Sequence, residues 1–302
     1  MRKQYQIGLL ALFFFLAFTS SAQSVLWKIT GKGLTKPSYL FGTIHIQDTR
    51  VFELSDSLLP AIEKADYLAL ELDLSNIDPF AIMGMMLLPD GKTLEDVFTK
   101  EEYALVKKEF EAQTGTSIEP FNTFKPFTLL TFIMLTHLDE GNNAPMALDE
   151  FLNYYAISKS TPVFGIEKQE EQMKVLDEMP KSAIIDALTE EDSVSLVLDS
   201  MINAYVNGDL ETVAKLIQED KTYGKWMNKL IDKRNKVMFE RTYEHIKNGE
   251  SVVIAVGTGH LAGETGLIKL YKKKGYKVKP IVTTKTAVSD STWQAVAKLK
   301  GL

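Results

Sequence analysis

The sequence contains no cysteine among its 302 residues. This absence excludes disulfide bonds, thiolate metal ligands, a cysteine nucleophile and a lipid anchor attached to an N-terminal cysteine. Histidine is also rare, with four copies in the chain. Any bound metal would therefore need ligands from these histidines and from aspartate or glutamate.

Dense runs of basic residues are absent as well. The chain has 34 lysine and arginine residues against 40 aspartate and glutamate residues, which gives a formal net charge of -6. Because nucleic acids are bound through clustered positive charge, a nucleic-acid partner is not expected. The hydrophobic fraction of 45% and the charged fraction of 25% are typical of a globular protein and exclude a wholly disordered or multi-span membrane chain.

The first 22 residues follow the pattern of a cleavable export signal. Arg2 and Lys3 provide the positive start, and the apolar run at residues 7–18 is shorter than the roughly 20 residues that a membrane-spanning helix needs. The small residues at 20–22 offer a cleavage site before Gln23. We therefore expect a periplasmic or secreted protein that is not a lipoprotein, with an uncleaved membrane anchor as the alternative. No second apolar run reaches membrane length, so no stable membrane span is expected after cleavage.

Strands are predicted near both ends of the mature chain. On the N-terminal side a hairpin, a helix and a further strand are indicated at residues 25–30, 38–42, 56–65 and 67–74. On the C-terminal side the order is strand, helix and strand, at residues 251–256, 263–274 and 276–282. Since the first of these C-terminal strands is apolar throughout, the sheet is expected to be covered on both faces.

The long middle of the chain, from about residue 78 to 246, has a helical apolar period. Its clearest helical segments are residues 100–113, 125–137, 147–159 and 224–246, with a short strand at 161–166. No linker rich in proline, glycine and serine interrupts residues 23–302, which favours one domain. The predicted fold class is α/β, with a central mixed sheet built from two βαβ-like halves and a large helical insertion. Residues after 284 carry too few apolar positions for a helix or strand to be predicted there.

Two of the four histidines follow predicted strands in the same short pattern, G-T-x-H. The first pattern runs from Gly42 to His45 and the second from Gly257 to His260. In open α/β sheets, ligands bind beyond the carboxyl ends of the strands, where glycine lets the backbone bend sharply. Two such turns on neighbouring strands would direct two imidazoles at one point. A hydrogen-bonded structural histidine is the alternative for each one alone.

Glu71, near the end of the strand predicted at 67–74, can add a carboxylate to this point. Two imidazoles and a carboxylate suit Mn, Co, Zn or Fe. A divalent ion held in this way can lower the pKa of a bound water and polarise a carbonyl group. Asp73 occupies the alternate strand position and is the second candidate ligand. The two remaining histidines, His137 and His245, are expected to be structural or exposed.

Arg234 is predicted to lie within an apolar helix stripe, beside Leu230 and Met238. A guanidinium in that setting needs a carboxylate partner or an anionic ligand. Three carboxylates are candidates for the partner: Glu71, Asp149 and Glu167. A purely structural ion pair is the alternative for Arg234, and a favourable charge at a helix N-terminus is the alternative for Glu167.

Other catalytic signatures are missing or weak. The chain has no G-x-x-x-x-G-K-[ST] phosphate loop and no G-x-S-x-G nucleophile turn. Residues 257–263 have the glycine spacing of a dinucleotide-binding turn, but residues 277–280 read Lys-Val-Lys-Pro where an acidic residue is expected. The insertion also carries aromatic and methionine residues that could line a substrate cleft or simply pack the core: Met83, Met85, Met86, Phe124 and Phe127.

Several segments together resemble the TraB/GumN family. They are L-W-K-I-T-G at 26–31, Y-L-F-G-T-I-H at 39–45, L-A-L-E-L-D at 68–73, G-I-E-K-Q-E-E-Q at 165–172, the Arg234-Asn235 pair and V-G-T-G-H-L-A-G at 256–263. This family includes the Tiki metalloproteases and is distantly similar to erythromycin-esterase and ChaN-like proteins. The resemblance covers nearly all of the mature chain in the same order.

The resemblance implies a metal-dependent hydrolase with an active centre formed by His45, His260 and Glu71, while Glu167 and Arg234 match later acidic and arginine positions. The sequence thus predicts an exported hydrolase, in the first place a peptidase, that acts on a peptide or another small amide or ester through a metal-activated water. A non-catalytic metal- or haem-binding protein of the same fold is the main alternative. The second alternative is an exported scaffold protein without catalytic activity.

Overall fold

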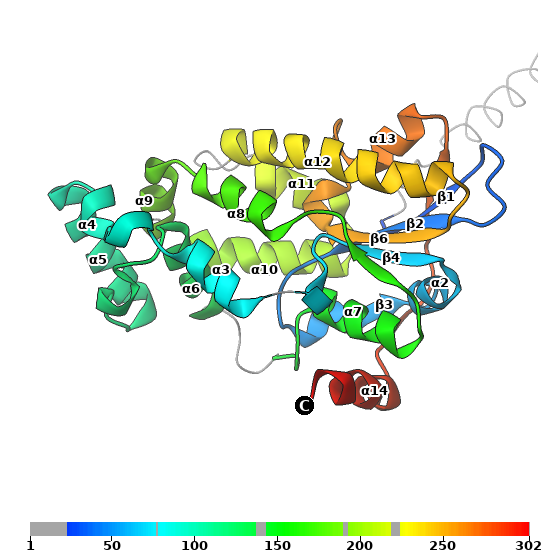
Figure 1. The fold of residues 1–302 in the computed structure, drawn as a ribbon, viewed down its shortest axis with the longest axis horizontal. Helices are drawn as coiled ribbons and strands as arrows, with labels where there is room; N and C mark the ends of the chain where they lie inside the picture. The colour runs from blue at the N-terminus through cyan, green and yellow to red at the C-terminus, as the bar shows by residue number, and fades with distance from the viewer. Residues whose placement is uncertain (1–22, 77, 137–142, 190–192, 219–223, 302) are drawn as a thin grey trace, which may run out of the picture.

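The computed structural model describes residues 23–301 apart from residues 77, 137–142, 190–192 and 219–223. The predicted export signal and His137 therefore lie outside the described residues. Figure 1 shows a β-sheet flanked by helices at one end of the molecule and a group of helices at the other. None of the described helices has an apolar stretch long enough to cross a membrane.

The central sheet has six strands in the order β5-β4-β6-β2-β1-β7. These strands are β1 (Leu26–Thr30), β2 (Ser38–Thr43), β4 (Tyr67–Leu70), β5 (Val163–Gly165), β6 (Val252–Gly257) and β7 (Lys277–Pro280). β5, β4, β6 and β2 run parallel to one another, whereas β1 pairs antiparallel with both β2 and β7. The predicted α/β class with a mixed sheet is thereby confirmed.

Helices cover the sheet and make up most of the rest of the chain. Those near the sheet are α2 (Leu58–Lys64), α7 (Leu148–Ser158), α12 (Gly224–Lys247) and α13 (Leu267–Lys273). The others in the middle of the chain are α3 (Pro79–Met86), α4 (Leu94–Val97), α5 (Lys100–Thr114), α6 (Phe127–Thr136), α8 (Gln169–Asp177), α9 (Lys181–Thr189), α10 (Ser193–Val206) and α11 (Leu210–Gln218). In Figure 1, α12 and α13 lie on one side of the sheet and α2 and α7 on the other, which is the two-sided cover that the apolar strand predicts.

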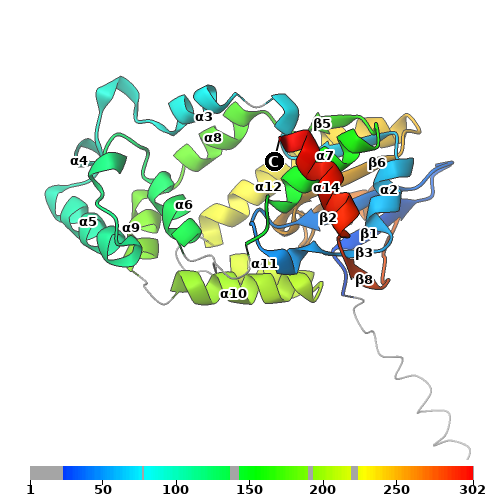
Figure 2. The same ribbon diagram turned by 90° about the horizontal axis from the view of Figure 1, so that it is seen from below.

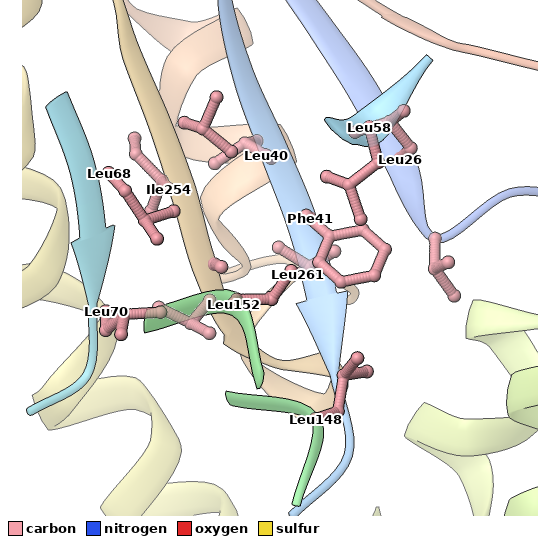
Figure 3. Packing of buried hydrophobic residues seen from close by; sticks show 14 of the residues in the cluster. Leu26, Leu40, Phe41, Leu58, Leu68, Leu70, Leu148, Leu152, Ile254 and Leu261 are labelled. Carbon is pink, nitrogen blue, oxygen red and sulfur yellow. The ribbon is translucent and has the colours of Figure 1, made fainter. Parts of the chain in front are cut away.

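The core of the sheet is built around β6, whose side chains are fully buried from Val252 to Val256. Figure 3 shows buried residues from three adjacent strands, Leu40, Leu68 and Ile254, and Leu152 of α7 belongs to the same hydrophobic cluster. Each fully buried leucine or isoleucine side chain stabilises the fold by roughly 1.5–3 kcal/mol relative to exposure. This packing fixes the positions of the strand ends that carry the polar residues described below.

A second hydrophobic cluster lies in the helices at the far end of the molecule, where Figure 2 shows α4, α5, α6 and α9 together. Phe110 of α5 lies at its centre and is fully buried. The ends of α5 follow from its sequence, because Thr99 and Glu102 form a capping box and Gly115 takes a left-handed conformation with φ 64°. The predicted insertion therefore has its own apolar core.

The chain differs from expectation mainly at element ends and near the C-terminus. β4 ends at Leu70, so Glu71 lies directly after the strand. A two-stranded sheet of β3 (Glu53–Ser55) and β8 (Lys285–Ala287) and a final helix α14 (Asp290–Lys300) were not predicted. Trp293 of α14 packs against Phe151 with ring centroids 4.9 Å apart, and Val296 is fully buried, so two residues anchor a helix that has few other apolar positions.

Candidate functional site

The two G-T-x-H turns leave the same edge of the sheet on adjacent strands. β2 and β6 are parallel, and their register pairs Gly42 with Val256 and Thr43 with Gly257. β4 flanks β6 on its other side, also in parallel. The carboxyl ends of three neighbouring strands thus meet at one edge, as the repeated pattern predicts.

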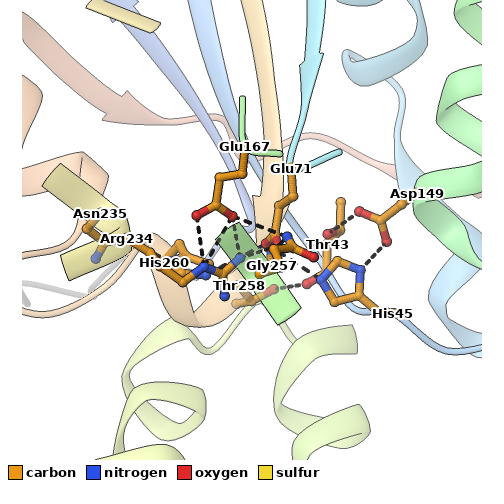
Figure 4. A network of polar contacts seen from close by, with 11 residues as sticks. Thr43, His45, Glu71, Asp149, Glu167, Arg234, Asn235, Gly257, Thr258 and His260 are labelled. Atoms are coloured by element: carbon orange, nitrogen blue, oxygen red, sulfur yellow. Dashed lines mark hydrogen bonds and ion pairs between the residues drawn. The ribbon is translucent and has the colours of Figure 1, made fainter. Parts of the chain in front are cut away.

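Three side chains from these strand ends converge. His45 follows β2, Glu71 follows β4, and His260 ends the short 3-10 helix η6 (Thr258–His260) after β6. The Glu71 Oε1 atom lies 3.6 Å from His45 Nε2 and 3.7 Å from His260 Nε2. Figure 4 shows the network of polar contacts that these three side chains share with their neighbours. The structure therefore brings together the residues proposed as metal ligands from the sequence.

His260 is held in one orientation by Asn235 of α12. Asn235 Nδ2 donates to the carbonyl oxygen of Thr265 at 3.1 Å, which leaves Oδ1 to face His260 Nδ1 at 2.7 Å. Since Oδ1 can only accept, Nδ1 is the protonated ring nitrogen. Burial lowers the pKa of His260 to about 4, because it outweighs the opposing attraction of Glu71. The neutral ring therefore directs the lone pair of Nε2 toward the Glu71 carboxylate.

His45 is held in the same way by Asp149 of α7. His45 Nδ1 lies 2.7 Å from Asp149 Oδ2, and Thr43 donates its hydroxyl to Asp149 Oδ1 at 2.7 Å. Desolvation lowers the pKa of His45, yet Asp149 and Glu71 raise it by more, so the pKa lies well above its usual value. Unlike His260, the His45 side chain is half-exposed, and it forms the open side of the site.

Glu71 is ionised and held by donors on both of its oxygens. Oε1 accepts from the backbone N–H of Gly257 at 2.8 Å, and Oε2 accepts from Arg234 at 2.7 Å and from Gln172 at 3.0 Å. Burial raises the pKa of Glu71, but the hydrogen bond to His45 and the charges around it lower the pKa well below its usual range. The carboxylate is therefore fixed in charge and in direction.

Arg234 joins two of the predicted carboxylates. Its Nη2 lies 2.6 Å from Glu167 Oε2, and its Nε donates to Glu167 Oε1 at 3.0 Å, which makes a bidentate pair. The same Nη2 reaches Glu71. The partners of Arg234 are thus Glu71 and Glu167, whereas Asp149 lies with His45 on the other side of Glu71.

Other predicted residues lie outside this group. Because β4 ends before Asp73, the strand alternation does not bring that carboxylate to the histidines; Asp73 instead accepts from the backbone N–H of Ser75 at 3.0 Å. His245 stacks on Phe164 with ring centroids 4.6 Å apart and lies 2.6 Å from Glu250, consistent with a structural role.

The turn glycines keep space open within the site. A Cβ atom on Gly257 would lie 3.2 Å from Glu71 Oε1 and 3.3 Å from His45 Nε2, so a side chain there would enter the space between the two groups. A Cβ atom on Gly42 would lie 2.8 Å from the hydroxyl of Thr258, between the two adjacent turns. Both positions therefore need glycine for close approach rather than for an unusual backbone angle.

The donor set fits a divalent cation by its chemistry. Each ring has a hydrogen-bond partner on Nδ1, as metal-binding imidazoles usually do. Both Nε2 atoms therefore face the same carboxylate oxygen. Ligand atoms about 2.1 Å from a tetrahedral ion lie roughly 3.4 Å apart, close to the separations of 3.6 and 3.7 Å. As they stand, however, no three histidine, aspartate or glutamate side chains among the described residues form a complete ligand set. The side chains of His45, His260 and Glu71 would need to shift slightly toward the cation to bind it.

A cavity of about 480 Å³ opens over these residues. Its polar floor is formed by the strand ends and Arg234. Apolar side chains from α8, α10, α11 and α12 form its walls: Val175, Leu176, Leu198, Met201, Val213, Ile217, Leu230 and Ile231. The helical insertion thus provides half of the residues that line the cavity.

Two contacts in the site were not predicted from the sequence. Gln172 donates to both Glu71 and Glu167, and Tyr205 of α10 donates its hydroxyl to the carbonyl oxygen of Gly42 at 3.0 Å. Gln172 belongs to the G-I-E-K-Q-E-E-Q segment, which gave a sequence signal without a role. Tyr205 gave no signal, because its partner is 163 residues away and is a backbone atom.

Comparisons with known proteins place the chain in a family. The model of the TraB/PrgY/gumN family matches residues 25–280. "Metalloprotease TIKI homolog" of Nematostella vectensis is 25% identical over 84% of this chain and 66% of its own length, and human "Metalloprotease TIKI1" is 25% identical over 86% of this chain and 62% of its own length. "Uncharacterized protein YbaP" of Shigella flexneri is 25% identical over 78% of this chain and 88% of its own length.

No solved structure matches the chain significantly. The chain spans less than two thirds of the length of the two TIKI relatives, so their whole-protein activity does not transfer directly. The family model, in contrast, covers most of the chain, including both G-T-x-H turns, Glu71, Glu167 and Arg234. The chain therefore belongs to the TraB/PrgY/gumN family.

Proposed function

We propose that the protein is an exported metal-dependent peptidase in which His45, His260 and Glu71 hold a divalent cation. The observation that carries the proposal is the convergence of two imidazole Nε2 atoms on Glu71 Oε1 at 3.6 and 3.7 Å. Both rings are anchored through Nδ1, and the carboxylate is ionised and buried. The names of the TIKI relatives agree with a metalloprotease at the family level.

The cation would be Mn, Co, Zn or Fe, since imidazole and carboxylate ligands suit all four. When bound, such an ion lowers the pKa of a coordinated water and polarises the carbonyl of a peptide, amide or ester. Asp149 and Asn235 keep the imidazoles in the orientation that binding needs.

Arg234 and Glu167 act as positioning residues in this proposal. The Arg234 guanidinium is engaged by Glu167 and Glu71, so it fixes the direction of the Glu71 carboxylate. Glu71 Oε1 faces the two imidazoles, so this oxygen would be the carboxylate ligand of the cation. In this proposal Arg234 therefore orients a carboxylate rather than binding an oxyanion.

The proposal includes export through cleavage after residue 22, to the periplasm or the outside of the cell. The sequence pattern of the first 22 residues supports it. Mass spectrometry of the protein isolated from cell fractions tests this part. An N-terminus at Gln23 in the exported fraction is expected, and an intact N-terminus in the membrane fraction would contradict it.

The catalytic part is tested by elemental analysis together with a proteome-derived peptide screen in the presence of each metal. His45→Ala and His260→Ala should each abolish metal binding and cleavage while the protein stays folded. His245→Ala is the matched control, because His245 contacts Phe164 and Glu250 rather than the site. Full cleavage by His260→Ala would refute the assignment.

A non-catalytic metal- or haem-binding protein is the second candidate. It is favoured by one observation: Glu167 and Asp149 are each engaged by a cationic or hydrogen-bonding partner, so neither is free to act as a separate base. Stoichiometric metal or haem with no cleavage of any library peptide would support this candidate over the peptidase.

A further inference from the structure

A second cavity of about 620 Å³ lies between α3, α6, α8 and α9. Its walls are mainly apolar and include Leu87, Phe127, Met179 and Ile184. Neither the metal ligands nor their supporting residues line it. The cavity is large enough for several side chains of a ligand.

The second cavity adjoins the candidate site through one residue. Leu176, near the C-terminal end of α8, lines both cavities. α8 also carries Gln172, whose amide contacts Glu71 and Glu167. Figure 2 shows α3 beside α8, and the two helices are in contact. A ligand that passes over the end of α8 could therefore occupy both cavities at once.

The charged side chains at the second cavity are paired. Lys125 Nζ lies 2.7 Å from Asp177 Oδ2. Lys181 Nζ donates to the carbonyl oxygen of Val97 at 2.8 Å. Because these cations already have partners, the cavity does not favour an anionic ligand, and its apolar walls favour an uncharged, hydrophobic one.

Helix α3 at the edge of this cavity exposes apolar side chains. Phe80 is 88% exposed, Met83 is 51% exposed, and Leu87, which follows the helix and lines the cavity, is 36% exposed. A helix that is apolar on all sides is normally buried, so exposure here indicates a surface that a partner covers. Methionine side chains adapt to different apolar partners, so such a surface can bind partners of different sequence.

We propose that the substrate is an extended peptide and that an apolar segment of it, distant from the scissile bond, binds this second cavity. This inference rests on the proposed peptidase function. A helix is about 10 Å across, and an extended peptide rises about 3.3 Å per residue, so crossing α8 takes at least three to four residues. The apolar segment therefore lies about four to six residues from the scissile bond.

The test begins with the best-cleaved member of a proteome-derived peptide library. Apolar residues four to six positions from its scissile bond are replaced by serine, and KM and kcat are measured for both peptides. We expect KM to rise about tenfold with kcat nearly unchanged, because the second cavity contributes binding that is equal in ground and transition states. The inactive His260→Ala variant should show the same difference in affinity for the two fluorescein-labelled peptides.

Leu87→Asp places a charge in the second cavity, and Leu105→Asp is the matched control. Leu105 is 38% exposed, close to Leu87, and lines neither cavity. Leu87→Asp should raise KM for the original peptide much more than for the serine peptide. The reason is that the protein substitution and the serine replacement each remove the same contact, between the apolar segment of the peptide and the second cavity. Leu105→Asp should change neither.

Cleavage with the same KM for both peptides would overturn the inference and leave the proposed function standing. Absence of any cleaved peptide would refute the proposed function and the inference with it. A loss of self-association in Leu87→Asp, measured by ultracentrifugation, with unchanged KM would assign the surface to a second copy of the chain. Loss of binding to neutral lipid vesicles with unchanged KM would assign it to a membrane surface.

Discussion

Asn235→Leu is the sharpest test of how the site is supported. Asn235 is fully buried, accepts from His260 Nδ1 at 2.7 Å and donates to Thr265 O at 3.1 Å. Leucine has a similar shape but neither polar atom. The variant therefore leaves the buried Nδ1–H of His260 and the partly buried carbonyl oxygen of Thr265 without these partners, while His260 itself and the other proposed ligands stay in the chain.

Asn235→Leu should lower both the stability of the protein and its affinity for the metal. An unsatisfied buried polar group costs about 1–3 kcal/mol, so the free energy of unfolding should fall by about 2–4 kcal/mol. Loss of the partner of a metal-binding imidazole weakens metal affinity by about 10- to 100-fold, which is about 1.4–2.7 kcal/mol of binding free energy. Urea unfolding measures the first quantity, and calorimetric titration with Co²⁺ or Zn²⁺ measures the second.

Asn235→Asp serves as the partner variant, because it keeps an acceptor for His260 Nδ1 and loses the donor to Thr265 O. It should recover most of the metal affinity but not all of the stability. If Asn235→Leu lost stability yet bound metal as tightly as the unchanged protein, Asn235 would be purely structural. The argument that its hydrogen bond prepares His260 Nε2 for a cation would then be refuted.

Three further predictions concern single sites. Asp149→Asn removes the charge facing His45 but keeps an acceptor, so metal affinity in the same titration should fall about tenfold, and unchanged affinity would refute this role. Gly257→Ala should keep native circular dichroism but lose metal binding, because the new Cβ would lie 3.3 Å from His45 Nε2; tight binding would show that the space is not needed. Arg241 holds the pKa of Glu171 at about 2 against an ordinary 4.5, so their stabilisation is present above pH 4.5 and is lost as pH falls toward 2. Both side chains are about 40% exposed, so Arg241→Gln should remove less than about 1 kcal/mol of this pH-dependent stability in urea unfolding, and an identical pH profile would contradict the pairing.

The sheet and its polar edge could be predicted because local sequence determines them. An uninterrupted apolar run such as residues 252–256 predicts a strand buried on both faces, and glycine at Gly42 and Gly257 marks where each strand turns. The repeated turn also indicates that His45 and His260 lie at equivalent strand ends. The parallel register of β2 and β6 then brings these ends together.

The parts that could not be predicted depend on contacts between distant residues. β3 and β8 are three residues each and form only because they pair across the chain, so neither has a clear pattern of its own. Assignment of Asp149 to His45 rather than to Arg234 depends on where α7 packs against the sheet, which apolar periodicity does not specify. Strand alternation does not determine where the Asp73 side chain lies, because the strand ends at Leu70, three residues before it.

The charges around Glu71 give an independent reason to expect a divalent ion. One connected network of contacts contains three carboxylates, Glu71, Asp149 and Glu167, and one guanidinium, Arg234. When both imidazoles bind a cation through Nε2 and are neutral, these groups carry a formal charge of two negative units in a largely buried place, where unpaired charge is costly. Without a cation, protonation of His45, whose pKa lies well above its usual value, offsets only one of the two units. One divalent cation at the imidazoles balances that charge, whereas a monovalent ion would leave half of it. Divalent ions should therefore raise the melting temperature at concentrations where Na⁺ and K⁺ have no effect, and equal effects of both kinds of ion would refute this reasoning.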